Sequence, residues 1–126
     1  MTLRVLAVDD SRTMRNLLSA ALAQAGFDVH LAEDGADGLQ RLADTAPDVV
    51  ITDINMPRLD GFGFIEAIRM SGDNRNVPIL VLTTESAPEL KARARTAGAT
   101  GWIVKPFDET KLVAAIERVA IPRGAT

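Results

Sequence analysis

The sequence predicts an α/β fold in which a doubly wound parallel sheet is covered by helices on both faces. Five short apolar runs alternate strictly with five helical patterns along the chain. This alternation favours parallel strands that are joined through right-handed helical crossovers. Several of the runs are apolar and β-branched without interruption, which is typical of strands buried on both faces.

The composition indicates one folded domain, which we expect to cover residues 1–126. Hydrophobic residues make up 47% of the chain, too many for a disordered protein. The net charge is −3 and the basic residues form no long run, so we expect no nucleic-acid binding. No apolar segment reaches membrane-spanning length, and no signal-peptide pattern opens the chain. We therefore expect a cytoplasmic monomer without membrane contact.

The first strand and helix are predicted over residues 3–26. Leu3–Val8 has the pattern of a short strand, which stops at Asp9, Asp10 and Ser11, where Asp and Ser side chains can cap a helix. Apolar residues three and four positions apart then predict a helix that ends at Gly26. These residues are Met14, Leu17, Leu18, Ala21, Leu22 and Ala25.

The next elements lead to Asp53. A weaker strand over Val29–Ala32 and a weaker helix over Ala36–Thr45 precede the third strand, which begins at Val49. This strand is apolar and runs almost directly into Asp53. A long turn follows, and the helix after it is expected to bury Phe64, Ile65 and Ile68.

The fourth strand is predicted over Pro78–Thr83 as a buried strand that ends on a polar residue. Ser86 and Glu89 have the spacing of a capping box, so a helix is expected to run to about Ala97 and stop at Gly98. Its apolar face is poor, and we expect packing to hold this helix less firmly than the first.

The last unit begins with a fifth predicted buried strand over Trp102–Val104, which ends at Lys105 and Pro106. Asp108 is expected to cap the final helix. The residues of that helix predicted to face inward are Leu112, Val113, Ile116 and Val119.

Four of the five strands end on a residue that can do chemistry. These residues are Asp9 with Asp10, Asp53, Thr83 and Lys105. Because parallel strands place their carboxyl ends on one edge of the sheet, we expect these side chains to form one site.

The carboxylates of Asp9, Asp10 and Asp53 would repel one another in such a site. A pair about 4 Å apart repels by roughly 4 kcal/mol at an effective dielectric near 20. Either one carboxylate takes up a proton or a hard cation lies among the oxygens, and Mg²⁺ suits a small all-oxygen site that also holds phosphate. Asp53 is then expected to act as a nucleophile toward a phosphoryl donor, with Lys105 and the Thr83 hydroxyl holding the phosphoryl oxygens.

Each of these residues also has a simpler interpretation. Asp9 and Asp10 can serve only as a helix cap, Thr83 as a strand residue, and Lys105 as a solvated strand end. Their joint occurrence at successive strand ends favours the site. His30 is the only histidine, and its place within a strand predicts a structural role.

Over nearly its whole length the chain resembles the receiver domain of two-component response regulators, most closely the single-domain chemotaxis regulators of the CheY type. The matching motifs are Val8–Ser11, Asp53–Pro57 with Asp60 and Gly61, Leu82–Glu85, and Ala97–Phe107. The resemblance implies a flavodoxin-like sheet of strand order 2-1-3-4-5 with five helices. It also implies a single receiver domain without an output domain.

The resemblance implies that Asp53 accepts a phosphoryl group from a histidine kinase of the chemotaxis type. It implies that Asp10, Asp53 and the backbone carbonyl of Asn55 ligate Mg²⁺, with Asp9 acting partly through water. Asn55 and Glu85 occupy positions that tune hydrolysis of the phosphoryl group. Such a protein catalyses its own phosphorylation and dephosphorylation and is not a conventional enzyme.

The resemblance also implies that Thr83 and Trp102 form a switch pair and that the bond before Pro106 is cis. Tryptophan is larger than the aromatic residues common at this position, so permanent packing of Trp102 against the fourth helix is the alternative. Partners would bind the surface of the fourth helix, fifth strand and fifth helix. Its expected contact residues are Lys91, Arg95, Ala99, Trp102 and Lys111.

The leading hypothesis is a phosphorylation-driven binding switch in chemotaxis, read by a flagellar motor switch protein or a phosphatase. A phosphate sink that competes for kinase phosphate is an alternative within the same family. A Mg²⁺-dependent aspartyl phosphatase or phosphotransferase has the same nucleophile, but the short connections supply no cap over a substrate. A flavin carrier is disfavoured because Asp9 and Asp10 would repel its phosphate.

Overall fold

Five parallel strands form a single sheet in the order β2-β1-β3-β4-β5, in a computed structural model that describes residues 2–120. This confirms the predicted fold class and strand order. The strands are β1 (Arg4–Val8), β2 (Asp28–Ala32), β3 (Val49–Thr52), β4 (Ile79–Thr83) and β5 (Gly101–Val104).

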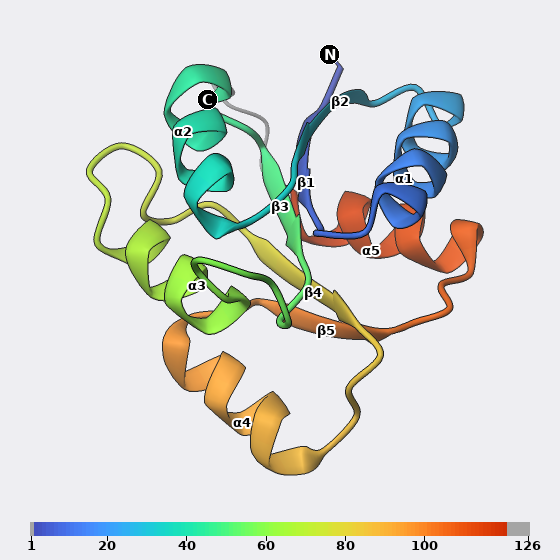
Figure 1. Cartoon of the computed structure of the whole chain (residues 1–126). Coiled ribbons are helices and arrows are strands. Elements are labelled where there is room, and N and C mark those ends of the chain that lie inside the picture. The colour runs from blue at the N-terminus through green and yellow to red at the C-terminus, as the bar shows by residue number, and fades with distance from the viewer. Residues whose placement is uncertain (1, 121–126) are drawn as a thin grey trace.

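The helices follow the strands one by one and cover both faces of the sheet. They are α1 (Arg12–Gln24), α2 (Gly35–Thr45), α3 (Gly61–Arg69), α4 (Pro88–Ala97) and α5 (Glu109–Val119). Helices α1 and α5 lie together on one face, and α2, α3 and α4 cover the other (Figure 1). No helix within residues 2–120 is long and apolar enough to cross a membrane.

The sheet separates two apolar cores. In β1, Leu6 and Val8 face the core under α2, α3 and α4, while Val5 and Ala7 face the core under α1 and α5. All four side chains are almost completely buried. The central strands are therefore apolar on both faces, which explains why their sequence shows no alternation.

The fifth strand is less buried than predicted. Strand β5 pairs only with β4 and forms one edge of the sheet. Trp102 and Ile103 are partly exposed, and Val104 is 40% exposed. The prediction of a buried strand was wrong because a three-residue apolar run carries no information about its place in the sheet.

The predicted caps Ser11 and Asp108 are confirmed, because each side chain accepts a hydrogen bond from a backbone N–H in the first turn of its helix. Asp34 and Asp60, which were not predicted as caps, act in the same way at the start of α2 and α3. The expected inward residues Phe64, Ile65 and Ile68 of α3 are fully buried. The first helix ends one residue before Ala25, ahead of Gly26, as expected.

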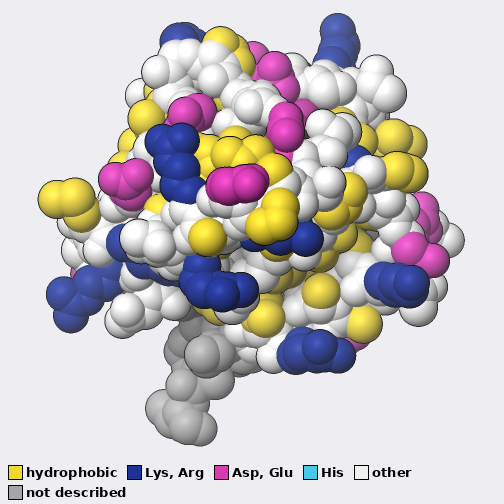
Figure 2. Space-filling model, turned by 90° about the horizontal axis from the view of Figure 1, so that it is seen from below, with side chains coloured by type: hydrophobic (Ala, Val, Ile, Leu, Met, Phe, Trp, Pro, Cys, Tyr) yellow, Lys and Arg dark blue, Asp and Glu magenta, His cyan; other side chains and the backbone are white. Residues whose placement is uncertain are grey.

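The capping box predicted for α4 does not form. Ala87 is the N-cap, with no side-chain hydrogen bond, because Pro88 occupies the first helical position and so starts the helix one residue later than Ser86 requires. Only Ala94 is buried in this helix. Figure 2 views the molecule from the side on which α4 lies and shows scattered Lys and Arg side chains around hydrophobic ones.

One predicted core residue of α1 points away from the sheet. Leu17 is 53% exposed, whereas Leu18 is buried. Neighbouring residues lie about 100° apart around a helix, and the stripe through Leu18 and Leu22 contacts the sheet. The same geometry leaves Val113 of α5 only partly buried beside the buried Leu112.

Candidate functional site

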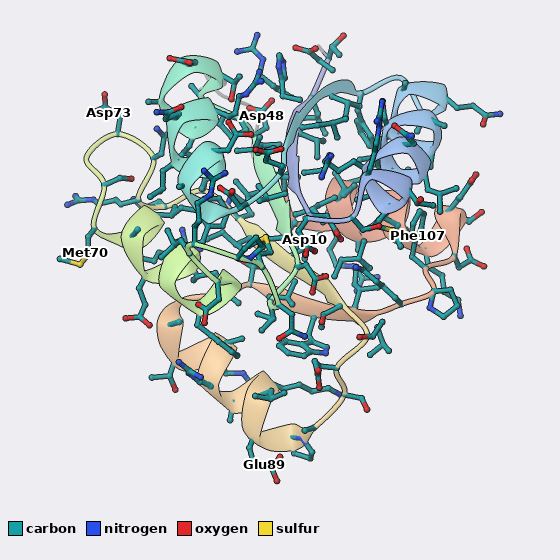
Figure 3. All side chains as sticks on the ribbon, in the orientation of Figure 1. Asp10, Asp48, Met70, Asp73, Glu89 and Phe107 are labelled. Atoms are coloured by element: carbon teal, nitrogen blue, oxygen red, sulfur yellow. The ribbon has the colours of Figure 1, made fainter. Side chains whose placement is uncertain are left out.

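The predicted residues lie where the strands end. Asp9 and Asp53 directly follow β1 and β3, Thr83 closes β4, and Lys105 follows β5. Figure 3 shows Asp10 toward this end of the sheet, far along the strands from the labelled Asp48, which precedes β3. The carboxyl edge of the sheet thus gathers side chains from four strands, as the parallel topology predicts.

Lys105 joins two of the acids. Its Nζ donates to Asp9 Oδ2 at 2.7 Å and to Asp53 Oδ2 at 2.8 Å. The lysine side chain is 10% exposed, and the two carboxylates are 2% and 10% exposed. These ion pairs are largely shielded from water, which strengthens the attraction between the charges and raises the cost of losing either partner.

Backbone groups hold the other carboxylate oxygens. Asp53 Oδ1 accepts a hydrogen bond from the Ile54 N–H at 2.6 Å, and Asp9 Oδ1 accepts one from the Ser11 N–H at 2.9 Å. The Asp53 N–H itself donates to the carbonyl of Val8, so the β1 and β3 ends are hydrogen-bonded beside the site. Both carboxylates are therefore fixed in orientation before any ligand binds.

Burial and hydrogen bonding shift the pKa values of Asp9 and Lys105. Burial raises the pKa of Asp9 above its ordinary value, and the hydrogen bonds from Lys105 and the Ser11 N–H offset this only in part. Burial opposes the charged form of Lys105, but the hydrogen bonds and charges of Asp53 and Asp9 prevail and raise its pKa. Lys105 therefore remains a cation at neutral pH. Additional positive charge near Asp9 would stabilise the ionised form of its carboxyl group.

Three carboxylates present a donor set that fits a hard cation. Asp9, Asp10 and Asp53 each offer an oxygen, and these oxygens lie within 4.8 Å of one another. Asp9 and Asp53 are buried and Asp10 is exposed, so the site opens to solvent on the Asp10 side. An all-oxygen set of this size suits Mg²⁺, which keeps several waters and needs only one or two carboxylates as direct ligands.

The family model described as the response regulator receiver domain matches residues 5–117. The chain belongs to this family. Receiver domains bind Mg²⁺ at an acidic pocket and interact with histidine kinases. The three clustered aspartates of this receiver domain correspond to such a pocket.

Relatives of this receiver domain include both short and long proteins. It is 40% identical to the probable chemotaxis protein CheY of Rhizobium etli, over 93% of this chain and 92% of that protein. It is 41% identical to the transcriptional regulatory protein PrrA of Mycobacterium leprae, over 98% of this chain but 52% of PrrA. It therefore spans about half the length of PrrA.

A solved structure with the same fold is the chemotaxis protein CheY4 of Vibrio cholerae. The TM-score is 0.90 and the sequence identity 44%, with 94% of this chain and 99% of that chain covered. The Lys105–Pro106 bond is cis, as the resemblance implied.

Glu85 connects the remaining predicted site residues of the receiver domain. Its backbone N–H donates to Thr83 Oγ1 at 3.3 Å, and its Oε1 accepts from Asn55 Nδ2 at 3.2 Å. Its backbone carbonyl accepts from the indole Nε1 of Trp102 at 3.0 Å. The loop after β4 is therefore hydrogen-bonded to the loop after β3 on one side and to β5 on the other.

The five predicted contact residues lie on one face. Lys91, Arg95, Ala99 and Trp102 line a hollow of about 90 Å³ between α4 and β5. Lys111 lines a neighbouring hollow that shares Trp102. Trp102 packs against the core under α4. Its role as the switch partner of Thr83 stays a prediction.

Two residues near the site were missed by sequence analysis. Asp34 is 1% exposed and pairs with Arg58 of the loop after β3. Asp34 lies three residues before Asp37, the spacing of an N-cap, but no local pattern identifies a partner 24 residues away. His30 lies within a strand, β2, as predicted, and its Nε2 is 3.3 Å from Asp28 Oδ2.

Proposed function

We propose that this receiver domain accepts a phosphoryl group from a histidine kinase on Asp53 and thereby changes its affinity for a partner protein. The observation that supports this most strongly is the Asp53 carboxylate held between Lys105 and a backbone N–H inside a cluster of three acids. A preoriented carboxylate beside a fixed cation suits nucleophilic attack on phosphorus, where catalysis depends on alignment and charge stabilisation.

Mg²⁺ would be held by Asp10, Asp53 and the backbone carbonyl of Asn55, with Asp9 acting partly through water. When bound, the ion neutralises charge on the transferred phosphoryl group. A carboxylate oxygen of Asp53 forms a bond to phosphorus while the bond from phosphorus to the donor nitrogen breaks, and the electron pair leaves on that nitrogen.

Lys105 and Thr83 would then contact the new phosphoryl oxygens. Lys105 already lies 2.8 Å from Asp53 Oδ2 and carries the required charge. The Thr83 hydroxyl accepts a hydrogen bond from the Glu85 N–H, so its own proton remains to be donated to a phosphoryl oxygen. The side chains of Asn55 and Glu85, which are hydrogen-bonded to each other, would tune hydrolysis of the aspartyl phosphate.

The change at Thr83 would be transmitted to Trp102 through Glu85. The partner-binding surface is the α4, β5 and α5 face, with contacts from Lys91, Arg95, Ala99, Trp102 and Lys111. A chemotaxis pathway is favoured by the similarity to CheY of Rhizobium etli over nearly the whole of both chains. The kinase would then be of the chemotaxis type, and the partner a flagellar motor switch protein or a phosphatase.

Two other roles use the same chemistry. The domain would act as a phosphate sink if it took phosphoryl groups from the kinase and lost them by hydrolysis without binding a partner protein. A role in transcriptional control is the third candidate, suggested by the similarity to PrrA, of which the chain spans about half. In either case Asp53 remains the acceptor, and the binding partner of the phosphorylated form distinguishes the three roles. That residues 1–126 form one receiver domain stays a prediction.

The acceptor is tested with Mg²⁺, a small phosphodonor such as phosphoramidate, and intact-protein mass measurement. The wild-type protein is expected to gain one phosphoryl group, and Asp53→Asn to gain none. Asp108→Asn is the matched control, because Asn also caps helices and Asp108 lies at the start of α5. Phosphoryl uptake by Asp53→Asn at the wild-type rate would refute the assignment.

A further inference from the structure

The loop between β3 and α3 carries Asn55 and contains a strained residue. Arg58 adopts a left-handed backbone conformation with φ of 66°, which side chains other than Gly, Asn and Asp rarely adopt. Strain of this kind persists only where the surrounding contacts impose it, and such positions cluster at ligand clamps. The contacts that impose it at Arg58 are therefore of functional interest.

The guanidinium of Arg58 binds the N-terminus of α2. Its Nε donates to Asp34 Oδ2 at 2.7 Å, its Nη2 donates to the same oxygen, and Nη2 also lies 3.3 Å from Glu33 Oε1. Although the Arg58 side chain is 64% exposed, that of Asp34 is only 2% exposed. Removing the partner of an almost fully buried carboxylate is costly, because the charge is then left unpaired. This ion pair is therefore expected to be stronger than an ordinary surface ion pair.

Asp34 is itself immobilised by α2. Its Oδ1 caps the helix by accepting the Asp37 N–H at 2.9 Å, so the two carboxylate oxygens have separate partners. The hydrogen bond from Asp37, together with Arg58, lowers the pKa of Asp34. Arg58 is thus attached to a carboxylate that is fixed to a helix end and remains charged.

A backbone contact lies beside this ion pair. The Gly35 N–H donates to the carbonyl of Leu59 at 3.3 Å. A Cβ at Gly35 would lie 2.6 Å from that oxygen, so the loop rests directly on the start of α2. At its base the loop is closed by the Gly61 N–H, which donates to the Ile54 carbonyl at 2.8 Å. Asn55 lies between these two points of attachment.

We propose that Arg58 and Asp34 are positioning residues that hold the β3–α3 loop so that the Asn55 carbonyl is already placed for a divalent cation. This inference rests on the proposed Mg²⁺-dependent function of the acidic pocket. Neither residue touches the cation or the phosphoryl group. The ion pair excludes loop conformations in which the Asn55 carbonyl is misplaced. Without the ion pair, the loop would populate these conformations and the protein would bind the metal more weakly.

The test is calorimetric titration of the full chain with MgCl₂. Asp34→Asn keeps a helix-capping side chain but removes the charge, and Arg58→Asn keeps a residue that tolerates the left-handed conformation but removes the guanidinium. Each variant is expected to bind Mg²⁺ about tenfold more weakly, the lower end of the loss caused by removing outer partners of metal ligands. The double variant is expected to bind no more weakly than either single one, because both remove the same contact.

Arg41→Gln is the matched control. Arg41 pairs with Asp37 at 3.7 Å on the same helix and makes no hydrogen bond or ion pair with the loop among the described residues. Its Mg²⁺ affinity is expected to equal that of the wild-type protein. Melting temperatures of the metal-free proteins are measured alongside, because a purely structural ion pair lowers the melting temperature and leaves the affinity of the folded protein unchanged.

Mg²⁺ affinities of Asp34→Asn and Arg58→Asn within twofold of wild type would overturn the inference, whatever the melting temperatures. Additive losses in the double variant would also overturn it, because the two residues would then act separately. Absence of Mg²⁺ binding by the wild-type protein would overturn the proposed function as well. If the wild-type protein binds Mg²⁺ and the variants bind it with the same affinity, only the positioning role is overturned.

Discussion

Replacing Lys105 by Met removes the one cation that pairs with the carboxylates of both Asp9 and Asp53 among the described residues. Its two ion pairs, at 2.7 and 2.8 Å, each correspond to about 6 kcal/mol of Coulomb energy at an effective dielectric near 20. Desolvation of the three groups offsets most of this. Breaking a buried pair typically costs about 3–5 kcal/mol, and we expect Lys105→Met to lower the free energy of unfolding by about 3 kcal/mol at neutral pH.

This loss should depend on pH in a defined direction. The pKa of Lys105 is raised in the folded protein, so its stabilising contribution is complete at neutral pH and is lost only as the pH rises through that pKa. Burial raises the pKa of Asp9 in the folded protein. The protonated Asp9 therefore stabilises the folded state at pH values below its pKa in the unfolded chain, and this contribution is lost as the pH rises through its pKa in the folded protein. The deficit of Lys105→Met should therefore shrink in acid, where Asp9 becomes protonated.

The assay is urea unfolding followed by circular dichroism, without metal and with millimolar Mg²⁺, at neutral and acid pH. Mg²⁺ should restore part of the lost stability, because a ligand that binds only the folded protein stabilises it by mass action. Lys111→Met is the control, since Lys111 is exposed and lies in α5, and it should change stability by no more than about 0.5 kcal/mol. A loss below about 1 kcal/mol, or one equal at both pH values, would refute the reasoning.

Two further predictions concern the contacts around the site. Gly35→Ala should lower the free energy of unfolding by about 1–3 kcal/mol, because its Cβ would lie 2.6 Å from the Leu59 carbonyl oxygen, and an unchanged urea midpoint would contradict this. The fluorescence of Trp102, the only tryptophan, should change when Mg²⁺ and then beryllofluoride are added, because its indole N–H is bonded to the loop after β4. A flat response to both additions would contradict coupling between pocket and ring.

The candidate site at the carboxyl edge of the sheet was predictable because local pattern and topology are linked. An uninterrupted apolar run predicts a parallel strand, and parallel strands bring their ends together, so Asp9, Asp53, Thr83 and Lys105 could be placed in one site without any knowledge of their contacts. The identity of the partners within the site did not follow from the pattern. Nothing in the sequence shows that Lys105 bridges two acids.

The parts that were missed depend on packing between elements. The burial of β5 depends on its position at the sheet edge, and that of Leu17 on which stripe of α1 meets the sheet. The start of α4 depends on competition between Ser86 and Pro88 for the first turn. The Asp34–Arg58 pair joins two loops that are far apart in sequence, and the residues next to Asp34 and Arg58 in the sequence give no sign of this contact.

If Asp53 is phosphorylated as proposed, the hydrogen bonds of Glu85 limit how strongly this can change the α4, β5 and α5 face. Three of them link Thr83, Asn55 and Trp102 to the same loop. At about 1 kcal/mol each, their complete rearrangement is worth about 3 kcal/mol, which changes an equilibrium constant about 150-fold. A change from 1:99 to 99:1 needs about 5.5 kcal/mol. This loop alone therefore shifts the population only in part, and a partner that binds one state preferentially would have to supply the rest.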